Sequence, residues 1–495
     1  MWTDTFRGDT IKGMNEQKKK RYNYIIFFMM WLVYTAATLL LFHRQTVHYD
    51  GRYESDISPY VLYMQGINVG YEYPYPIMFW VGKVFSLVFA PKLALALAVT
   101  GLNCLTPLLL KGFWDSYLER RRFLREKGEG SLEASRKTKH PLLQALVSNL
   151  LLFTSLFVSM LYFPLTGWLG GEEGRVSALA EAGIVNRYVG VFSPNPFHNA
   201  TYLAARGFSV AAFFLFLEIL QRNEKTDIFQ AKGSSLDRSK STYLLYGAFS
   251  LSLLLTTMTK PSFTLGFVAS AGLVLLYRWI KDGLVKTWKR YVTIGFLFIP
   301  TFAALLYQYS GVFTGANALG EEQGIGFGLL TAWHTAVKNV PLAILLGLAF
   351  PLIVLLFHSK KLWKNQMFGF SWLMMVINLG MMALLYEKGF RLGHLNFAWG
   401  YMCGQFFVFL SSLMLIYQET REQIGRRYVA GVSKSTKAIE ADENDRRNGT
   451  DGRSDTAGRN LGKILILLIE WSIFAMHLLC GILYFVDIMQ GGKFV

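Results

Sequence analysis

The side chains best suited to chemistry gather in four short stretches between long apolar runs. The first stretch contains Asp50 and Asp56, and Ser55 can cap a helix that begins near Ile57 or Ser58. Such a helix would hold the Asp56 carboxylate beside the positive end of its dipole, which keeps the carboxylate ionised. An ionised carboxylate can accept the proton of a hydroxyl nucleophile or hold a cation, whereas the alternative is that Asp56 is a simple helix cap.

The second stretch, Ser193–Thr201, reads Ser-Pro-Asn-Pro-Phe-His-Asn-Ala-Thr and runs directly into an apolar segment. Its two prolines favour extended backbone, which places His198 and Asn199 at the start of the following helix. His198 can donate to a phosphate or relay a proton, and the alternative is a histidine of the membrane interface. Asn199 also begins an N-glycosylation pattern, but a position against the bilayer makes it a poor acceptor.

The third stretch is a single charge, Lys260, between two apolar runs in the sequence Thr259-Lys260-Pro261. A lysine at membrane depth is costly to keep, so it is expected to have a function and an anionic partner. A phosphate group would satisfy it. The alternative is that its long side chain extends to the membrane surface.

The fourth stretch begins at Glu387 and is the densest in polar and aromatic side chains. Arg391 offers a planar fork of donors that suits a phosphate. His394 and Asn396 are polar groups of the kind that hold sugar hydroxyls, and Trp399 offers a ring face for stacking. Together these side chains predict a substrate-binding surface.

The apolar runs between these stretches must position them. Of the 495 residues, 52% are hydrophobic and only 17% are charged, and a membrane span needs about 20 apolar residues. We therefore predict an all-α, polytopic membrane helical bundle of about eleven spans. These are expected near residues 23–42, 93–113, 141–164, 202–220, 243–258, 262–279, 291–307, 340–357, 367–386, 400–417 and 463–487.

The formal charge of +17 raises the possibility of nucleic-acid binding, but the positive residues sort by side of the membrane. With a cytoplasmic N-terminus, most Lys and Arg fall on cytoplasmic segments, as the positive-inside rule requires. Basic clusters such as Arg120–Arg122 and Lys286–Arg290 are then topology signals and contacts to anionic lipids, so no nucleic-acid partner is predicted. The four stretches fall on the non-cytoplasmic face.

Four parts are expected along the chain: a cytoplasmic N-terminal segment 1–22, a transmembrane catalytic domain 23–417, a flexible cytoplasmic linker 418–462, and a final transmembrane helix with a short outer tail 463–495. The run Lys18–Arg21 leads into a full-length apolar stretch, so the first helix is expected to be a retained anchor. Pro76–Phe89 is apolar but too short to cross the bilayer, which predicts an interfacial helix or, alternatively, a re-entrant element.

Metal and disulfide chemistry are not predicted. The three cysteines all lie in apolar segments, which argues against a disulfide framework and a zinc site. The acids are scattered without the spacing of metal ligands, so neither a metal nor another cofactor is expected.

Together these segments resemble the C-type glycosyltransferases, a superfamily of multi-span enzymes that take sugars from polyprenyl-phosphate carriers. The resemblance covers most of the membrane region. It lies in the acidic first outer loop with interfacial helices after it, the Pro-Asn-Pro-Phe-His-Asn segment, the stretch Thr259–Phe263 and the stretch Glu387–Trp399. Unlike the family pattern, the first loop has no adjacent pair of acids.

The resemblance implies roles for particular residues. Asp56, with Asp50 as its rival, would deprotonate the acceptor hydroxyl, while Lys260 and Arg391 would hold the carrier phosphate. From their own chemistry, the residues expected to help to bind the substrate are His198, Asn199, Glu387, His394, Asn396 and Trp399. The reaction would be a single displacement with inversion at the anomeric carbon, and a metal is not chemically required. The implied partners are a polyprenyl-phosphate-linked sugar donor, the lipid bilayer, and a glycan, lipid or protein acceptor, and the implied location is a prokaryotic plasma membrane.

Two alternatives remain open. A membrane transporter or lipid-linked glycan flippase would use charged groups within the spans, but intramembrane acids are few, Glu218 and Glu470 being the main ones, and no pair of broken helices recurs in two halves. A polysaccharide polymerase or ligase would use Arg391 and His394 without an essential Asp56.

Overall fold

The computed structural model describes residues 3–46, 52–53, 55–70, 72–128, 141–162, 190–225, 236–313, 322–440 and 451–492. Within these ranges, nine helices are long and apolar enough to cross a membrane, so the chain is an all-α polytopic membrane bundle. A small antiparallel sheet of β1 (Ile325–Phe327) and β2 (Leu385–Glu387) accompanies them. The other elements are α1 (Thr3–Gln45), α2 (Ile57–Met64), α3 (Ile77–Phe85), α4 (Pro91–Gly128), α5 (Pro141–Thr154), α7 (Ala200–Lys225), α8 (Leu236–Thr259), α9 (Ser262–Asp282), α10 (Leu284–Phe296), α11 (Ile299–Phe313), η3 (Trp333–Thr335), α12 (Val340–His358), α13 (Lys361–Lys364), α14 (Gln366–Leu384), η4 (Gly389–His394), α15 (Asn396–Glu440) and α16 (Asp451–Met489).

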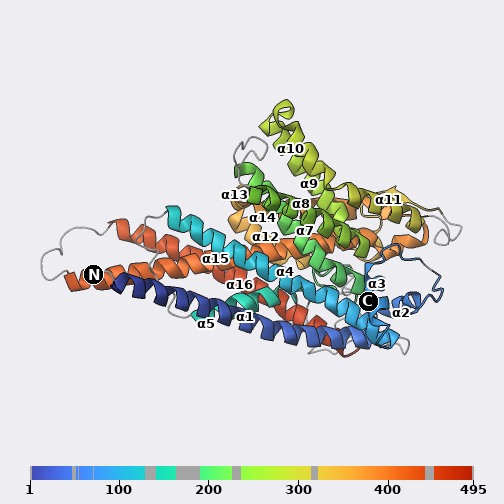
Figure 1. Ribbon diagram of the computed structural model, residues 1–495, viewed down its shortest axis with the longest axis horizontal. Coiled ribbons are helices and arrows are strands. Elements are labelled where there is room, and N and C mark those ends of the chain that lie inside the picture. The colour runs from blue at the N-terminus through green and yellow to red at the C-terminus, as the bar shows by residue number, and fades with distance from the viewer. Residues whose placement is uncertain are drawn as a thin grey trace.

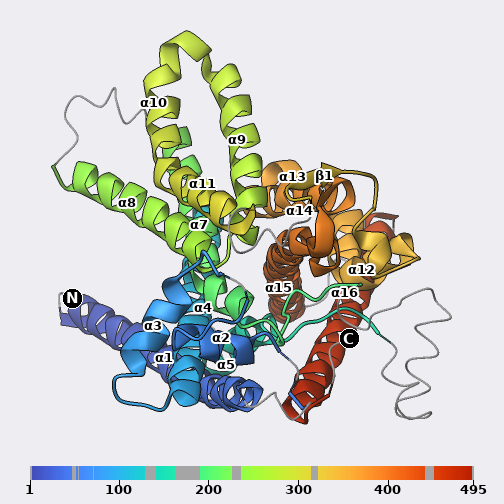
Figure 2. The ribbon, with the colours of Figure 1, turned by 90° about the vertical axis from the view of Figure 1, so that its right-hand side faces the viewer.

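Nine of the predicted spans coincide with these helices, and two do not. Residues 243–258 and 262–279 lie in separate helices, α8 and α9, each long enough to span. The span predicted at 291–307 covers parts of α10 and α11, which are bent by 46° at a short break and are together long and apolar enough to form one broken span. Figure 2 shows α9 and α10 side by side, projecting away from the rest of the bundle.

The span predicted at 141–164 is wrong in its second half. Helix α5 ends at Thr154, and the described residues 155–162 run on as non-helical chain that is almost entirely buried. Non-helical backbone at membrane depth is tolerated only where protein satisfies its polar groups. Here Ser159 N donates to the His477 carbonyl of α16 at 3.1 Å, and Leu161 N donates to the Leu346 carbonyl of α12 at 2.9 Å. Two neighbouring helices therefore replace the missing helical hydrogen bonds.

Gly481 of α16 lets this segment approach the helix closely. A Cβ atom at Gly481 would overlap the backbone carbonyl oxygen of Phe157, whereas a Cβ atom at Gly462 of the same helix would meet nothing within 4 Å. We expect Gly481→Ala to lower the free energy of unfolding by about 1–3 kcal/mol, the usual cost of overpacking. Gly462→Ala is the control and should leave stability unchanged or slightly raised. Thermal unfolding in detergent measures both, and equal midpoints for the two variants would contradict the close packing.

Helices α7 and α15 form the centre of the bundle. They join through stacked rings of Phe213 and Phe407, whose centroids lie 4.2 Å apart. Nearby, Gly266 of α9 and Gly400 of α15 both face Asn378 of α14, and a Cβ at either position would collide with its side chain. Small residues thus bring three central helices together, as is typical of membrane bundles.

The two ends of the bundle differ. In Figure 1, helices α1, α4, α15 and α16 extend beyond the body on the side where the N-terminus lies. Helices α2, α3 and α11 lie at the other end, which faces the viewer in Figure 2. We call this second end the loop end, because α2 and η4 belong to stretches that were predicted to carry chemistry, and α3 lies in the predicted interfacial segment Pro76–Phe89.

Helical structure extends into the region that was predicted to be a flexible linker, residues 418–462. Helix α15 continues to Glu440 and α16 already begins at Asp451, while residues 441–450 lie outside the described residues. The first helix is likewise unbroken across residue 22, where a domain boundary was predicted. Arg, Lys, Glu and Ala are strong helix formers, so a charged sequence can extend a helix beyond its apolar span.

Candidate functional site

A cavity of about 610 Å³ at the loop end brings the predicted stretches together. It lies between α2, the start of α7, the turn from α8 to α9, and the segment from η4 into α15. Eight of the predicted site residues line it: Asp56, His198, Asn199, Lys260, Arg391, His394, Asn396 and Trp399. Asp50 lies outside the described residues, and Glu387 does not line the cavity.

Asp56 immediately precedes α2, and its side chain does not cap that helix. The cap is Ser55, whose Oγ accepts from Ile57 N at 3.3 Å and donates to the His198 carbonyl at 2.8 Å. The Asp56 carboxylate instead accepts a hydrogen bond from Asn199 Nδ2 at 2.8 Å. The capping role considered for Asp56 therefore belongs to Ser55, which also ties the first loop to the chain before α7.

Lys260 lies in the two-residue break between α8 and α9, where Pro261 prevents one helix from continuing into the next. Its Nζ donates to Thr201 Oγ1 at 3.1 Å and lies 4.4 Å from the ring centroid of Trp399. Burial lowers the pKa of Lys260, while the nearby Asp56 opposes that shift. These contacts hold the partly exposed side chain in the cavity wall.

His198 is buried, and its Nδ1 lies 2.6 Å from the hydroxyl of Tyr484 on α16. Its ring also packs near Trp399, with centroids 5.9 Å apart. Burial lowers the pKa of His198, and the Lys260 charge lowers it further. The imidazole is therefore neutral at pH 7, so it can offer a hydrogen bond to a substrate but no positive charge.

Arg391 lies in η4, and its position depends on a tightly folded loop. The residue is only 9% exposed, its Nε has no hydrogen-bond partner among the described residues, and its Cζ lies 5.2 Å from the Phe390 ring centroid. Leu395, which ends η4, has a φ of 51°, a left-handed conformation that is uncommon for a leucine. Strained backbone of this kind persists where surrounding structure holds it, as at binding sites.

Glu387 lies outside the cavity and contacts one of its lining residues, Asn396. It belongs to β2, which pairs with β1, and its Oε2 accepts from Asn396 Nδ2 at 2.7 Å. Burial raises the pKa of Glu387, and the hydrogen bond from Asn396 and the charge of Arg391 oppose that shift. Glu387 thus orients Asn396, which lines the cavity.

Several lining residues were missed by the sequence analysis. The first loop also contributes Tyr60, Glu72, Tyr73 and Tyr75 to the cavity wall. The Tyr73 ring meets the Tyr60 ring edge-on, with centroids 4.9 Å apart. The alternation of Tyr, Glu and Pro in residues 71–76 was the available signal, because rigid aromatic side chains beside a carboxylate are typical of binding surfaces.

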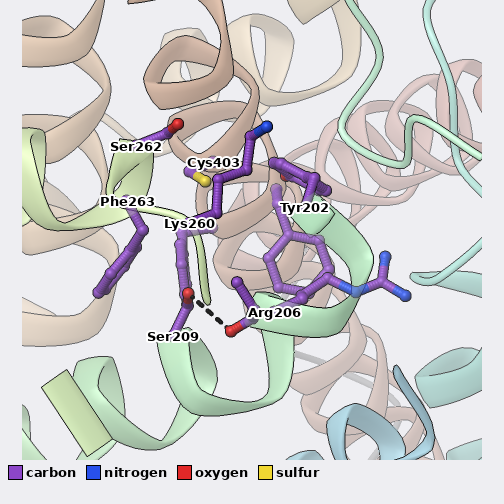
Figure 3. A pocket seen from close by; sticks show the side chains of 10 residues that line it. Tyr202, Arg206, Ser209, Lys260, Ser262, Phe263 and Cys403 are labelled. Atoms are coloured by element: carbon purple, nitrogen blue, oxygen red, sulfur yellow. Dashed lines mark hydrogen bonds between the residues drawn. The ribbon is translucent and has the colours of Figure 1, made fainter. Parts of the chain in front are cut away.

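A second, much smaller cavity lies next to Lys260 and has room for about one water molecule, at about 10 Å³. Figure 3 shows its lining, with the Arg206 guanidinium pointing away from Lys260. Arg206 Nη2 donates to Tyr34 Oη and Asn103 Oδ1, both at 3.0 Å, and Nη1 donates to Asn195. These neutral partners lie on α1, α4 and the chain before α7, so Arg206 holds the bundle together beneath the large cavity.

Within the described residues, no group of three His, Cys, Asp or Glu side chains is arranged to hold a metal ion. The cavity instead combines two carboxylates, Asp56 and Glu72, with two cationic side chains, neutral donors and aromatic rings. No family model matches the chain, and no curated protein or solved structure matches it either.

Proposed function

We propose that the protein is a membrane glycosyltransferase that moves a sugar from a polyprenyl-phosphate carrier to an acceptor hydroxyl on the non-cytoplasmic face. The observation that carries this proposal is the convergence of Asp56, Lys260 and Arg391 on one cavity. A buried guanidinium whose Nε has no partner in the described part of the chain favours an anionic ligand, because an unpaired buried polar group is costly.

The three charged groups match the needs of one displacement step. The acceptor oxygen bonds to the anomeric carbon as the bond from that carbon to the carrier phosphate breaks, which inverts the configuration. Asp56 receives the hydroxyl proton. The bonding pair leaves with the polyprenyl phosphate, and Lys260 and Arg391 stabilise the charge that develops on its oxygens.

Helix α3 gives the lipid carrier a surface to lie on. It begins directly after the tyrosine-rich segment, and its exposed side chains include Trp80 and Val84, followed by the exposed Leu87 and Val88. Phe79 on its buried side contacts the Tyr73 ring, with centroids 5.7 Å apart. An amphipathic helix of this kind suits the membrane interface, where a lipid tail can remain in the bilayer while its head group reaches the cavity.

The transporter alternative has less support in the bundle. Glu218, one of the intramembrane acids it would use, pairs with Arg222 at 2.9 Å. The other, Glu470, lies 3.1 Å from His358 Nε2. Neither acid lines the large cavity. Each of these two acids thus lies beside a basic side chain, while the cavity at the loop end holds the convergent polar groups.

Transfer in reconstituted vesicles tests the proposal. Polyprenyl-phosphate hexoses and pentoses, labelled in the sugar, are offered with glycan, lipid or peptide acceptors in parallel. The expected result is transfer of the label with polyprenyl phosphate as co-product. A carrier that crosses the bilayer with its sugar attached would identify a flippase instead, and the absence of transfer with every donor would refute the proposal.

Donor binding should weaken at alkaline pH. The lowered pKa of Lys260 means that its ammonium loses the proton below the usual lysine value of 10.5. The charged form exists below the lowered pKa and is lost as pH rises through it, so the KM for the donor should rise there. Lys260→Arg keeps a permanent charge and should remove this rise. Donor KM measured from neutral to alkaline pH checks both, and an identical alkaline rise in the two proteins would contradict the assignment.

A further inference from the structure

The Asn199 side chain is fixed at both of its polar atoms. Its Oδ1 accepts from Tyr202 N at 2.9 Å and from Thr201 Oγ1 at 3.0 Å, so Asn199 caps the N-terminus of α7. Because a backbone N–H can only donate, the amide atom that faces Tyr202 must be the oxygen. The Nδ2 group is therefore directed to the other side, where it donates to Asp56 Oδ2 at 2.8 Å.

Thr201 links the Asn199–Asp56 hydrogen bond to the Lys260 ammonium. Since its hydroxyl hydrogen is used toward Asn199, Thr201 Oγ1 is an acceptor for Lys260 Nζ, at 3.1 Å. A continuous chain of hydrogen bonds, all with the same direction, then runs from the Lys260 ammonium through Thr201 and Asn199 to the Asp56 carboxylate. Asn199 and Thr201 are each only 1% exposed, which leaves little of either side chain for contact with a substrate.

We propose that Asn199 is a positioning residue for the Asp56 base, and that Thr201 couples this position to the phosphate-binding Lys260. This inference rests on the proposed glycosyl transfer and changes the role of Asn199 from substrate binding to orientation of the base. Asn199 holds one carboxylate oxygen from a helix end, so the carboxylate keeps its direction as the donor enters. A base that rotates away from its acceptor loses rate, because small misplacements of reacting groups are expensive in catalysis.

The test uses substitutions that keep the helix cap and remove the donor. Asp and Ser are both good N-cap residues, so Asn199→Asp and Asn199→Ser should preserve α7 while losing the Nδ2–H groups. We expect kcat to fall by about 10- to 100-fold in both variants, with donor KM within about threefold of wild type and an unchanged thermal midpoint. The Ser variant adds no charge, so a loss shared by both cannot come from repulsion of Asp56.

Matched variants complete the experiment. Asn339 caps α12 by accepting from Leu342 N at 3.1 Å, so Asn339→Asp is the same change at another helix start and should leave kcat unchanged. Thr201→Val removes the linking hydroxyl and should lower kcat, whereas Thr201→Ser keeps it and should restore most of the rate.

Three results would overturn the positioning role. If the wild-type protein transfers sugar and both Asn199 variants keep kcat within about twofold, the proposed function stands and the positioning role is wrong. If donor KM rises while kcat is unchanged, Asn199 binds substrate instead. If the wild-type protein transfers no sugar, the proposed function fails and the positioning role fails with it.

Discussion

Replacing Asp56 by Asn is expected to lower kcat by about 10²- to 10⁴-fold, the usual contribution of a general base. The Asn side chain can still accept the hydrogen bond that Asn199 donates at 2.8 Å, but it cannot take the acceptor proton. Because the Asp56 side chain does not cap α2, the substitution should leave the thermal midpoint close to that of wild type. Steady-state transfer with a labelled polyprenyl-phosphate sugar provides the measurement.

Asp282 offers a control for this variant. Asp282 ends α9, its carboxylate accepts from Tyr291 Oη of α10 at 2.6 Å, and it does not line the large cavity. Asp282→Asn should therefore leave kcat unchanged. Full activity of Asp56→Asn would remove the base assignment and favour a polymerase or ligase that uses Arg391 and His394.

Replacing Arg391 by Met should weaken binding of the donor phosphate strongly. Truncating one partner of a buried, hydrogen-bonded charge pair costs about 2–5 kcal/mol, which is about 30-fold or more in affinity. Arg391→Lys should recover only part of this loss, because a lysine cannot reproduce the planar fork. Titration of the purified protein with polyprenyl phosphate, the expected co-product, measures the affinity without requiring turnover.

The stability of the Arg391 variant separates binding from a structural role. In the absence of ligand, the buried Arg391 Nε has no partner among the described residues, so removing the guanidinium should leave the thermal midpoint unchanged or raise it. Arg222→Lys is a control near the other end of α7, where Arg222 pairs with Glu218, and it should leave the phosphate affinity unchanged. A lower midpoint for Arg391→Met with unchanged phosphate affinity would show that Arg391 only supports the fold.

The sequence was sufficient for most of the transmembrane architecture, because a long apolar run has few alternatives to a spanning helix. Prediction from the sequence failed where the local structure depends on contacts with other segments of the protein. Residues 155–162 are as apolar as a membrane-spanning helix, yet they are not helical. The backbone N–H groups of Ser159 and Leu161 donate instead to carbonyl groups of α16 and α12. The bend between α10 and α11 and the helical continuation of α15 to Glu440 likewise could not be found from hydropathy alone.

For the candidate site, the sequence determined which residue types were present and which loops carried them. Lys260 was recognisable because a charge between apolar spans is costly to keep. Arg391 was recognisable because its planar fork of donors suits a phosphate. For Asn199, the position before a helix was visible in the sequence, but the hydrogen bond to Asp56, 143 residues away, was not.

Only the tertiary structure decided which of these groups meet. The hydrogen bonds from Lys260 to Thr201 and from Asn199 to Asp56 join segments far apart in the chain, and the contact of His198 with Tyr484 spans 286 positions. Hydrophobic patterning determines which segments enter the membrane, because it is a property of each segment alone. The direction and partner of a buried polar side chain depend instead on how helices pack, and that is fixed only when all of them are in place.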